Sequence, residues 1–505
     1  MRTGGGVCER DVACRVLIAL LALSSCTGDD PVPIRQGSGY RLVPRFVGHP
    51  AASRPLVGAP VPQHPFMAAG GSNNMHGDSY VSDTHAASGP LGRAPVVVST
   101  ARGLLGGECA AVTFDRRGRI LTVCASAARM ELLLLDPRTL RELAHYRLPR
   151  RPSTRTLSIR TITSDTSGGV YFYLDERDRA VLGTAARRIE LVAHDDSGFH
   201  LERAYDLAPV VPEGDGVTAV LPDWTGRYWF VTRHGLVGTV DRRSGRIAIR
   251  RLAGEEIENS FAVGPDGVFI VSDHALYGFT ADAAIGAPEI AWRETYDRGT
   301  RRKVGQIDQG SGTTPTLLGE EWVAIADNAE PRLNVLVYRR RPDVAGTRLV
   351  CRQPLFAPGA SATENTFVGF GRSLIVENNA GYDIFPTMMF GRTSAGGVAR
   401  VDLDDDGQGC HVVWESGEIS QTAVPKLSLG NGLLYLYTKL PHAPWWTDAY
   451  YLTAVDFRSG EAVYGILTGT GLGYDNHWAA ITLGRDGTAY VGTLRGLIAV
   501  RDGDG

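Results

Sequence analysis

Lysine, long apolar segments and sustained helical periodicity are all scarce in this sequence of 505 residues. Lysine occurs only at positions 303, 426 and 439, and the formal net charge of −3 leaves no basic face for nucleic acid. After residue 25, no stretch approaches the roughly 18 consecutive apolar residues that a membrane-spanning helix needs. We therefore predict a chain that binds no nucleic acid and that has no membrane-spanning helix after residue 25.

Turn-forming residues are abundant instead. The chain has 61 glycine and 27 proline residues, too many for a helical protein, while its 43% apolar residues are enough for a core. From about Val96 onward, short apolar or alternating runs separated by glycine-containing turns replace any helical period. The predicted fold class is all-β.

The first 26 residues carry the pattern of an export signal. Three arginines precede the apolar run VLIALLAL, which is too short to cross a bilayer as a mature helix but suits a secretory signal. The run ends in Leu23-Ser24-Ser25-Cys26, which resembles the lipobox of bacterial lipoproteins, where the cysteine thiol takes up lipid. We expect residues 1–25 to be removed and Cys26 to be lipidated in the cell envelope. Free secretion after cleavage near Ser25 is the alternative.

Four cysteines then remain in an oxidising compartment. Cys109 and Cys124 flank the turn at residues 115–119 almost symmetrically, so a hairpin would place them on facing strands within reach of a disulfide. A link between Cys351 and Cys410 is a weaker prediction, because their separation depends on tertiary packing. Buried free thiols are the alternative for all four cysteines.

The chain divides into an irregular N-terminal part and a repetitive remainder. Residues 26–94 show little periodic pattern and are predicted to form a tether and an irregular wrap. Residues 95–505 contain a repeated hairpin of small and apolar residues, a tight turn and a more β-branched or aromatic strand. The hairpin is clear at residues 261–273, 315–327, 366–378, 425–438 and 479–493, and looser at 111–125, 162–174 and 218–232.

These eight hairpins recur at intervals of roughly 40 to 60 residues, the range expected of propeller blades. Two further strands follow each hairpin, except that the last unit has only three strands before the chain ends. The isolated run PVVVST at residues 95–100 can supply the missing outer strand, which would close the ring and remove an exposed edge. We predict an eight-bladed β-propeller, with seven blades as the alternative.

The turn between the last two strands of a unit carries a family resemblance. Ala454-x-Asp456-x-x-Ser459-Gly460-x-x-x-Tyr464 resembles the repeat of the quinoprotein alcohol dehydrogenase-like (PQQ-like) propeller superfamily. The resemblance implies the fold. It does not imply the PQQ cofactor, because the family's docking tryptophans are not at the matching positions and the vicinal cysteine pair of many quinone-dependent members is missing.

Polar residues precede several of the inner strands, at one rim of the predicted ring, where a site would be assembled. These rim candidates are Asn259, Ser311, Thr313, Thr314, Asn365, Gln421, Asn476 and His477. They either bind a polar ligand together or satisfy backbone groups at the strand starts. A serine nucleophile at Ser311 is not expected, because G-S-G lacks the G-x-S-x-G elbow.

Four further polar residues follow the second strands of two units and should return to the same rim. Asp327, Asn328, Glu377 and Asn378 offer carboxylate and amide oxygens that suit calcium, or a pair of groups for acid and base chemistry. Hydrogen-bonded loop ends are the alternative.

Two other segments have metal-ligand patterns. Asp402, Asp404 and Asp406 form a D-x-D-x-D-G sequence, as calcium loops do, although Val413 stands where a bidentate glutamate would be expected. A plain turn is the alternative. His76, Asp78, Asp83 and His85 crowd together before the first unit, either as a metal site or as part of a wrap across the propeller.

The leading functional prediction is an exported, lipid-anchored propeller that binds a small molecule or protein partner at its rim. The alternatives are an extracytoplasmic enzyme, either a quinone- or calcium-assisted oxidoreductase or a lyase or hydrolase, and an assembly scaffold of the envelope. Fold alone does not supply a substrate.

Overall fold

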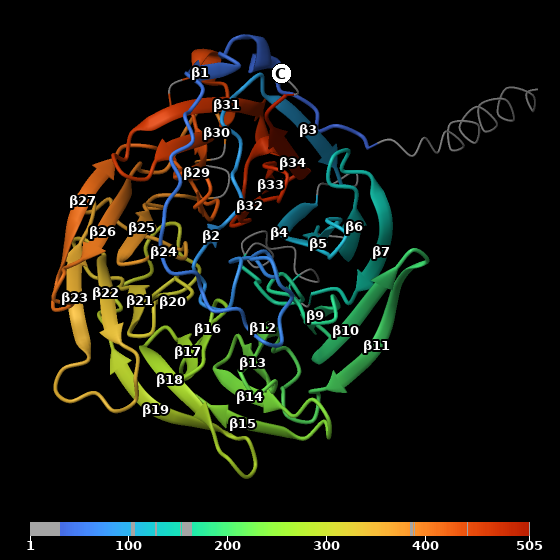
Figure 1. Ribbon diagram of the computed structural model, residues 1–505, viewed down its shortest axis with the longest axis vertical. Coiled ribbons are helices and arrows are strands. Elements are labelled where there is room, and N and C mark those ends of the chain that lie inside the picture. Colours follow the sequence, from blue (N-terminus) through green and yellow to red (C-terminus); the bar gives the residue numbers. More distant parts are fainter. Residues whose placement is uncertain are drawn as a thin grey trace, which may run out of the picture.

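A computed structural model describes residues 31–503, apart from residues 103–106, 127–128, 152, 154–163, 384–386, 388 and 442. The described chain forms eight antiparallel sheets arranged as a ring around a central axis (Figure 1). This is the predicted eight-bladed β-propeller, and the seven-bladed alternative is wrong. No helix in the described ranges is both long and apolar enough to span a bilayer.

Blades 1 to 4 each consist of four consecutive strands, which follow one another from the axis outward. Blade 1 contains β4 (Glu108–Phe114), β5 (Ile120–Ala125), β6 (Met130–Leu135) and β7 (Glu142–Leu148). Blade 2 contains β8 (Tyr173–Leu174), β9 (Ala180–Thr184), β10 (Arg188–Asp195) and β11 (Gly198–Asp206). Blade 3 contains β12 (Val217–Pro222), β13 (Tyr228–Thr232), β14 (Leu236–Val240) and β15 (Ile247–Arg251). Blade 4 contains β16 (Ala262–Gly264), β17 (Gly267–Val271), β18 (Ala275–Ala281) and β19 (Pro288–Thr295).

Blades 5 to 8 follow the same plan. Blade 5 contains β20 (Thr316–Leu318), β21 (Trp322–Ala326), β22 (Asn334–Arg339) and β23 (Leu349–Pro354). Blade 6 contains β24 (Val368–Phe370), β25 (Ser373–Glu377), β26 (Val398–Leu403) and β27 (Cys410–Ser416). Blade 7 contains β28 (Lys426–Ser428), β29 (Leu433–Lys439), β30 (Ala449–Asp456) and β31 (Ala462–Thr470). Blade 8 contains β32 (Ile481–Leu483), β33 (Ala489–Thr493) and β34 (Gly496–Arg501), with β3 (Val96–Ala101) as its outermost strand.

The ring is closed by strands from both ends of the described chain. Strand β3 pairs antiparallel with β34 over six residues, from Val96 opposite Arg501 to Ala101 opposite Gly496. The pairing gives the last blade its fourth strand and satisfies the edge that β34 would otherwise expose. The predicted role of PVVVST is confirmed.

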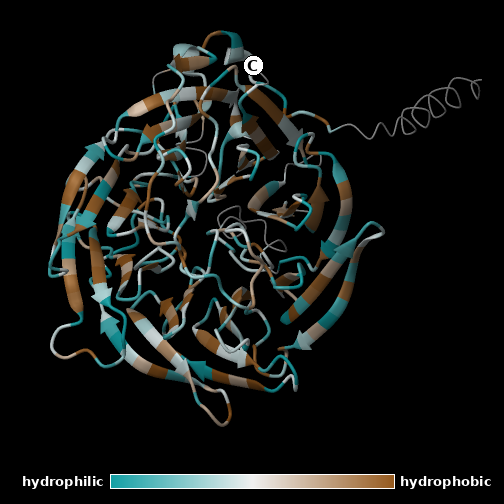
Figure 2. Ribbon diagram, in the orientation of Figure 1, coloured by the Kyte–Doolittle hydropathy of each residue, from teal (hydrophilic) through white to brown (hydrophobic). Residues whose placement is uncertain are grey.

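The burial of each strand follows its radial position. Strands in the middle of a blade are covered on both faces by neighbouring blades, so β13, with the sequence YWFVT, is buried at every residue. Outer strands have one face in solvent, and β15, with the sequence IAIRR, is half-exposed to exposed throughout. Figure 2 shows the same trend as alternating polar and apolar bands along the outer strands.

Blade 2 departs from the predicted hairpins. Residues 164–174 contain only the two-residue strand β8, and the first turn of this blade lies at residues 175–179 rather than within 162–174. An inner strand of two residues is too short to show alternation, which explains why the sequence placed the hairpin about ten residues too early. Residues 162 and 163 lie outside the described chain.

The N-terminal segment crosses the ring to its axis, as the blue trace in Figure 1 shows. Strand β1 (Phe46–Gly48) pairs with the outer strand β31, and β2 (Thr84–His85) pairs in parallel with the inner strand β28. Between these points, carbonyl groups of the segment accept hydrogen bonds from the free edges of four inner strands. The donor amides are Val263, Leu317, Gly369 and Leu427, and the acceptors are Ser79, Tyr80, Ser82 and Asp83, at 2.7 to 3.1 Å.

Two disulfides reinforce the ring. Cys109 and Cys124 face each other on β4 and β5 within blade 1 and are joined. Cys351 and Cys410 are also joined, and they link the outer strands β23 and β27 of adjacent blades. The second link ties two neighbouring sheets that hydrogen bonds between strands do not connect.

Candidate functional site

One end of the ring, called the rim below, collects the loops that lead into the inner strands and the loops that follow the second strands. The antiparallel order of each blade places both kinds of loop at this end. Eleven of the twelve predicted rim residues are buried there, and His477 is half-buried. The predicted residues therefore share one end of the molecule, and their contacts decide which of them can meet a ligand.

Several of the predicted residues hold loops together. Asp327 accepts hydrogen bonds from the backbone and the side chain of Asn334 at 2.6 and 2.7 Å. The side-chain amide of Asn328 donates to the carbonyl groups of Arg298 and Arg301, and that of Asn378 donates to two further loop carbonyls. These contacts match the alternative of hydrogen-bonded loop ends.

Other predicted residues make hydrogen bonds within their own blade or to a loop that follows the second strand of blade 6. The hydroxyl groups of Ser311 and Thr313 lie 2.8 Å apart, and Thr313 Oγ1 also accepts the amide of Ala326. Thr314 is buried beside them. The carbonyl of Gln421 accepts from Asn379, while the Asn476 side chain donates to the carbonyls of Ala479 and Gly492. His477 Nδ1 lies 3.1 Å from the hydroxyl of Tyr382.

Two contacts reach between blades at the rim. The hydroxyl of Tyr171 donates to Asn259 Oδ1 at 2.8 Å, and Asn259 Nδ2 donates to the carbonyl of Gly312 at 2.5 Å. These bonds join the leading loops of blades 2, 4 and 5. Within blade 6, Asn365 Nδ2 donates to Glu377 Oε2, also at 2.5 Å.

Three carboxyl groups gather beside these contacts: the buried Glu258 and Glu364 and the half-buried Asp308, called the rim carboxyl cluster below. Burial, and then the charge of Glu258, raises the pKa of Asp308 to about 7, although Arg233 opposes the rise. Burial raises the pKa of Glu258 as well, and burial together with the charge of Glu258 raises the pKa of Glu364 well above its ordinary value. The three groups therefore act on one another electrostatically.

The cluster has more acid than base. Arg233 forms ion pairs with Asp308 and with Glu256 at the edge of the site. The side chains of Glu258 and Glu364 are hydrogen-bonded to each other, and no N–H or hydroxyl group of the described chain donates to Glu364 Oε1 or Asp308 Oδ2. Because buried carboxylate oxygens are costly when unpaired, this cluster has an unmet demand for hydrogen-bond donors and positive charge.

The sequence prediction named the neighbouring residues Asn259 and Asn365 but none of the three acids themselves. Glu258 and Glu364 each begin a repeated E-N-[S/T] sequence before an inner strand, and that repeat was the available signal. Asp308 and Arg233 lie in irregular loops with no repeated pattern, so nothing in the sequence associates them with the two glutamates.

A second pair of acids, the half-buried Glu108 and the buried Asp475, lies between blades 8 and 1. Glu108 Oε1 accepts the backbone amide of His477 at 2.6 Å, and burial raises the pKa of Glu108 to about 8. Burial also raises the pKa of Asp475 to about 7, with Lys439 acting in the opposite direction. Asp475 Oδ2 is also buried without a hydrogen-bond partner in the described chain, and Lys439 forms its ion pair with Asp448. The rim carboxyl cluster differs from this pair in bringing three mutually interacting acids together.

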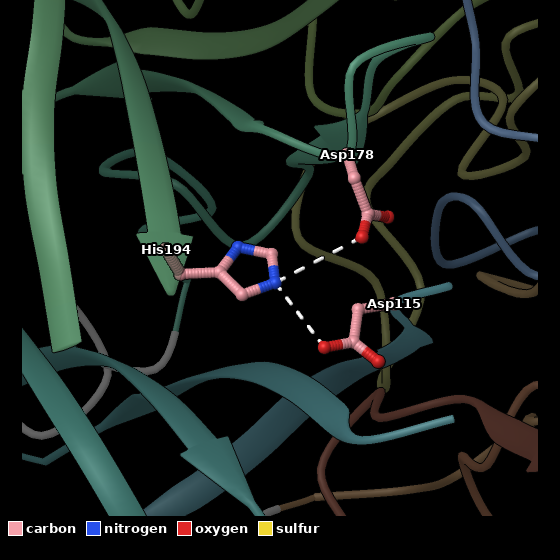
Figure 3. Close-up of side chains that lie close together, drawn as sticks. All are labelled: Asp115, Asp178 and His194. Carbon is pink, nitrogen blue, oxygen red and sulfur yellow. Dashed lines mark hydrogen bonds and ion pairs between the residues drawn. The ribbon is translucent and has the colours of Figure 1, made fainter. Parts of the chain in front are cut away.

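Three potential metal ligands meet at the opposite end of the ring, where Asp115, Asp178 and His194 point toward one another (Figure 3). His194 Nε2 lies 3.2 Å from Asp115 Oδ2 and 4.0 Å from Asp178 Oδ2. Asp115 Oδ2 is already bound by Arg119 Nε at 2.7 Å, and His194 Nδ1 is buried without the acceptor that usually orients a ligating histidine. The donor set fits a hydrogen-bonded link between blades 1 and 2 better than a metal centre.

The aspartates of the D-x-D-x-D-G sequence do not converge. Arg400 binds both carboxylate oxygens of Asp402, at 2.8 and 2.6 Å. His411 lies 2.7 Å from Asp404 Oδ1, and Asp406 Oδ1 accepts the amide of Gln408. These residues thus serve as turn and ion-pair residues between β26 and β27.

The crowded histidines and aspartates before the first blade lie in the N-terminal segment at the axis. His76 Nδ1 is 3.1 Å from Asp83 Oδ2, and Lys426 Nζ donates to Asp83 and to the carbonyl of Met75. Asp78 binds Ser82, and His85 Nδ1 lies 3.1 Å from Ser72 Oγ. These four residues are not gathered as metal ligands; they anchor the segment to β28 instead.

The residues present do not fit a quinone cofactor of the kind that the family resemblance would suggest. Both disulfides join residues far apart in sequence, so the vicinal cysteine pair of the quinone-dependent members is lacking.

No known protein family matches the sequence as a whole or in part. An uncharacterized protein of Archaeoglobus fulgidus is 27% identical over 350 residues, which cover 62% of this chain and 67% of that protein. Because this archaeal relative is uncharacterized, the similarity does not indicate an activity for this chain.

Solved structures share the propeller architecture. A europium-containing methanol dehydrogenase matches with a TM-score of 0.50 at 11% identity, covering 85% of this chain and 98% of that one. BamB from Moraxella catarrhalis matches with a TM-score of 0.45 at 14% identity, covering 75% and 92% of the two chains. Identities this low show the common fold alone.

Proposed function

We propose that this protein is an exported, lipid-anchored propeller that binds a small organic cation at the rim carboxyl cluster. The observation that carries the proposal is the acid surplus at the rim: the buried Glu258 and Glu364 and the half-buried Asp308 lie near one guanidinium group, and no described N–H or hydroxyl group donates to Glu364 Oε1 or Asp308 Oδ2. A ligand that brings positive charge and several N–H donors would satisfy both needs.

An ammonium or guanidinium group suits the cluster better than a bare metal ion. In the described chain the ligand atoms of Asp115, Asp178 and His194 lie close enough together to surround one ion, whereas those of the three rim acids do not. Oxygens that are too dispersed for one ion can still bind the separate N–H groups of an organic cation.

The two disulfides and the N-terminal sequence support the exported location. Disulfides persist in oxidising compartments outside the cytosol. The apolar run before Cys26 supports export, and the lipobox-like sequence supports lipidation; both lie outside the described residues.

Ligand binding can be tested by calorimetry and thermal unfolding with putrescine, spermidine, arginine amide and calcium chloride. We expect an organic amine to bind and to raise Tm, because a ligand that binds only the folded state stabilises it. Glu364→Gln should weaken binding at least about tenfold, whereas Asp405→Asn, at an exposed turn, should leave it unchanged. Equal amine affinity in wild type and Glu364→Gln would refute the rim as the site.

The anchor is tested separately by fractionation. Cys26→Ser should move the protein out of the detergent-soluble membrane fraction, because the acylated thiol is lost. Unchanged partitioning of this variant would refute the lipid anchor without affecting the binding test.

A second candidate function is acid and base catalysis at the same cluster. The observation that favours it is the pKa of Asp308, which burial raises to about 7, beside the raised pKa values of Glu258 and Glu364. This role would be established if the protein converts the bound cation to a product, and if Asp308→Asn reduces the rate of conversion while the affinity for the cation stays similar. Unchanged amine after prolonged incubation would leave binding as the function.

A further inference from the structure

Three large aromatic side chains project into solvent at one place on the rim. Phe390 is 65% exposed, Trp445 85% and Trp446 77%; these residues are called the aromatic tip below. They lie in the loops that follow the second strands of blades 6 and 7, and Trp445 and Trp446 belong to the short 3-10 helix η3 (Pro444–Trp446). Two adjacent tryptophans that are this exposed are unusual for a surface with no partner.

The backbone is strained at all three residues of the aromatic tip. Phe390, Trp445 and Trp446 all have positive φ angles, of 63°, 56° and 52°, a conformation that large side chains rarely adopt. Such strain persists where the surrounding structure imposes it, and it is concentrated at functional positions. Each of the three residues is therefore both exposed to solvent and held in a strained backbone conformation.

The tip stands on a rigid base. The carboxylate of Asp448 accepts the backbone amides of Phe390 and Gly391 at 3.2 and 2.9 Å, which joins the two loops. The ammonium group of Lys439, a fully buried side chain in β29, lies 2.7 Å from the same carboxylate. The aromatic side chains are thus presented by an ordered ion pair rather than by a free loop end.

The N-terminal segment reaches the same part of the molecule. Gly39, in the 3-10 helix η1 (Ser38–Arg41), lies against Thr447 so closely that an added Cβ would be 2.0 Å from its hydroxyl oxygen. Val43 packs with Ala443 and Ala449 on either side of the tip. The segment is also pinned at blade 8, where the carbonyl of Val32 accepts the amide of Ala101.

This path restricts where a lipid on Cys26 could lie. Four residues separate Cys26 from Pro31 in the sequence, so a lipid on Cys26 could be attached no farther than about 18 Å from the start of the described chain. The lipid would therefore be held near the rim end of blade 8, on the side of the molecule that carries the aromatic tip.

The surface between these points is apolar and basic. Val32 and Leu42 are exposed, as are the side chains of Arg35, Arg41 and Arg392, the last of which lies two residues from Phe390. Tryptophan is favoured at the boundary between headgroups and acyl chains, and arginine is attracted to anionic headgroups. The charge and the aromatic content thus match one kind of partner.

We propose that the aromatic tip and the adjoining N-terminal segment form a surface that inserts into an anionic lipid bilayer. This inference rests on the lipid anchor of the proposed function. Trp445 and Trp446 enter the headgroup region, the nearby arginines bind lipid phosphates, and the acyl chains of Cys26 act as the second attachment. Two attachments fix the orientation of the propeller, which one flexible tether does not do.

The test uses mature lipidated protein reconstituted in vesicles of phosphatidylglycerol and phosphatidylcholine, with bromine on the acyl chains as a quencher. Tryptophan emission should be quenched in the wild type and much less in the Trp445→Ser/Trp446→Ser variant. Ile285→Ser, a change of an exposed residue in a turn at the opposite end of blade 4, should be quenched like the wild type. Equal quenching in wild type and tip variant would overturn the proposal.

A flotation assay separates failure of the tip from failure of the anchor. If the exported protein lacks lipid, it should still float with anionic vesicles, and the double tryptophan variant should bind about a hundredfold more weakly, tenfold for each indole. Arg392→Glu should weaken flotation with anionic vesicles only. Equal flotation of the parent and the tip variant would refute the membrane surface. So would a tip variant that still binds lipid but no longer binds a protein that the parent binds. Neither result would affect the amine titration at the rim.

Discussion

The hydroxyl group of Tyr171, in the loop that leads into blade 2, donates a 2.8 Å hydrogen bond to Asn259 Oδ1, in the loop that leads into blade 4. Burial, and then the charges of Glu258 and Glu364, raises the pKa of Tyr171 far above its ordinary value, so the hydroxyl remains a donor at every physiological pH. The bond therefore links two non-adjacent blades beside the rim carboxyl cluster.

Tyr171→Phe should lower the free energy of unfolding by about 1 kcal/mol, because it removes one partner of Asn259 Oδ1 without changing the volume of the ring. It should also loosen the rim and weaken amine binding. Urea denaturation and calorimetry measure the two effects. Stability and affinity equal to those of the wild type would show that this link carries neither role.

The buried Glu377 should make the free energy of unfolding depend on pH. Burial raises its pKa to about 8, and the bond from Asn365 does not offset the rise. Below the ordinary pKa near 4.5 the group is protonated in both states; above it, only the unfolded state ionises freely. Stability should fall as pH rises from about 4.5 to 8. Glu377→Gln should flatten this slope and raise the unfolding free energy at pH 8 by about 2 kcal/mol.

The control for this pH effect is Asp195→Asn, which removes an exposed acid at a turn and should leave the slope between pH 4.5 and 8 unchanged. A Glu377→Gln protein whose unfolding curves follow the wild-type pH dependence would contradict the assignment of the slope to Glu377.

Lys426 and Asp83 form a buried ion pair that fastens the N-terminal segment to blade 7. Although burial opposes it, the charges of Lys426 and His76 hold the pKa of Asp83 below its usual value. Lys426→Met should destabilise the protein by about 3 kcal/mol or more, because it leaves a buried carboxylate with one partner fewer. Adding Asp83→Asn should restore part of the loss. Additive losses in thermal unfolding would show that the two residues act independently.

His194 should stabilise the protein without metal. His194→Phe removes the contact to Asp115 Oδ2 and should lower the unfolding free energy by about 1 kcal/mol through loss of the link between blades 1 and 2. Wild-type Tm should be the same in zinc chloride and in a chelator. A zinc-dependent rise in Tm that is absent from His194→Phe would instead establish a metal site here.

The regular blades could be predicted from sequence because their hairpins repeat. Turns such as residues 265–266 and 485–487 recur between apolar strands that are covered on both faces, and this local pattern survives in every blade with an inner strand of three residues or more. Blade 2 has only Tyr173 and Leu174 in its inner strand, so no alternation marks it.

The path of the N-terminal segment could not be predicted, since it pairs with the inner strands through backbone carbonyls. Ser79, Tyr80, Ser82 and Asp83 offer acceptors whatever their side chains are, and the contacts impose no period on the sequence. The link between Cys351 and Cys410 was weakly predicted for a related reason: it depends on how two blades lie side by side rather than on one hairpin.

At the rim, too, local sequence patterns could be predicted, whereas contacts made through tertiary packing could not. The repeated E-N-[S/T] sequences indicated where two acids enter, but the approach of Asp308 and Arg233 depends on loops with no regular conformation. The exposed aromatic tip was equally hidden, because nothing in the sequence distinguishes Trp445 and Trp446 from the aromatic residues of the core.

The pairing of β3 with β34 sets the order of assembly. Val96 and Arg501 lie opposite each other although almost the entire described ring separates them along the chain. Such contacts cost the most loop-closure entropy and form late. The axis-bound residues 79–85 precede β3, so they must already lie inside the ring, or be drawn in with β3, when the last blade closes. A chain that loses residues 496–501 would keep seven complete blades and still be unable to enclose its own N-terminal segment.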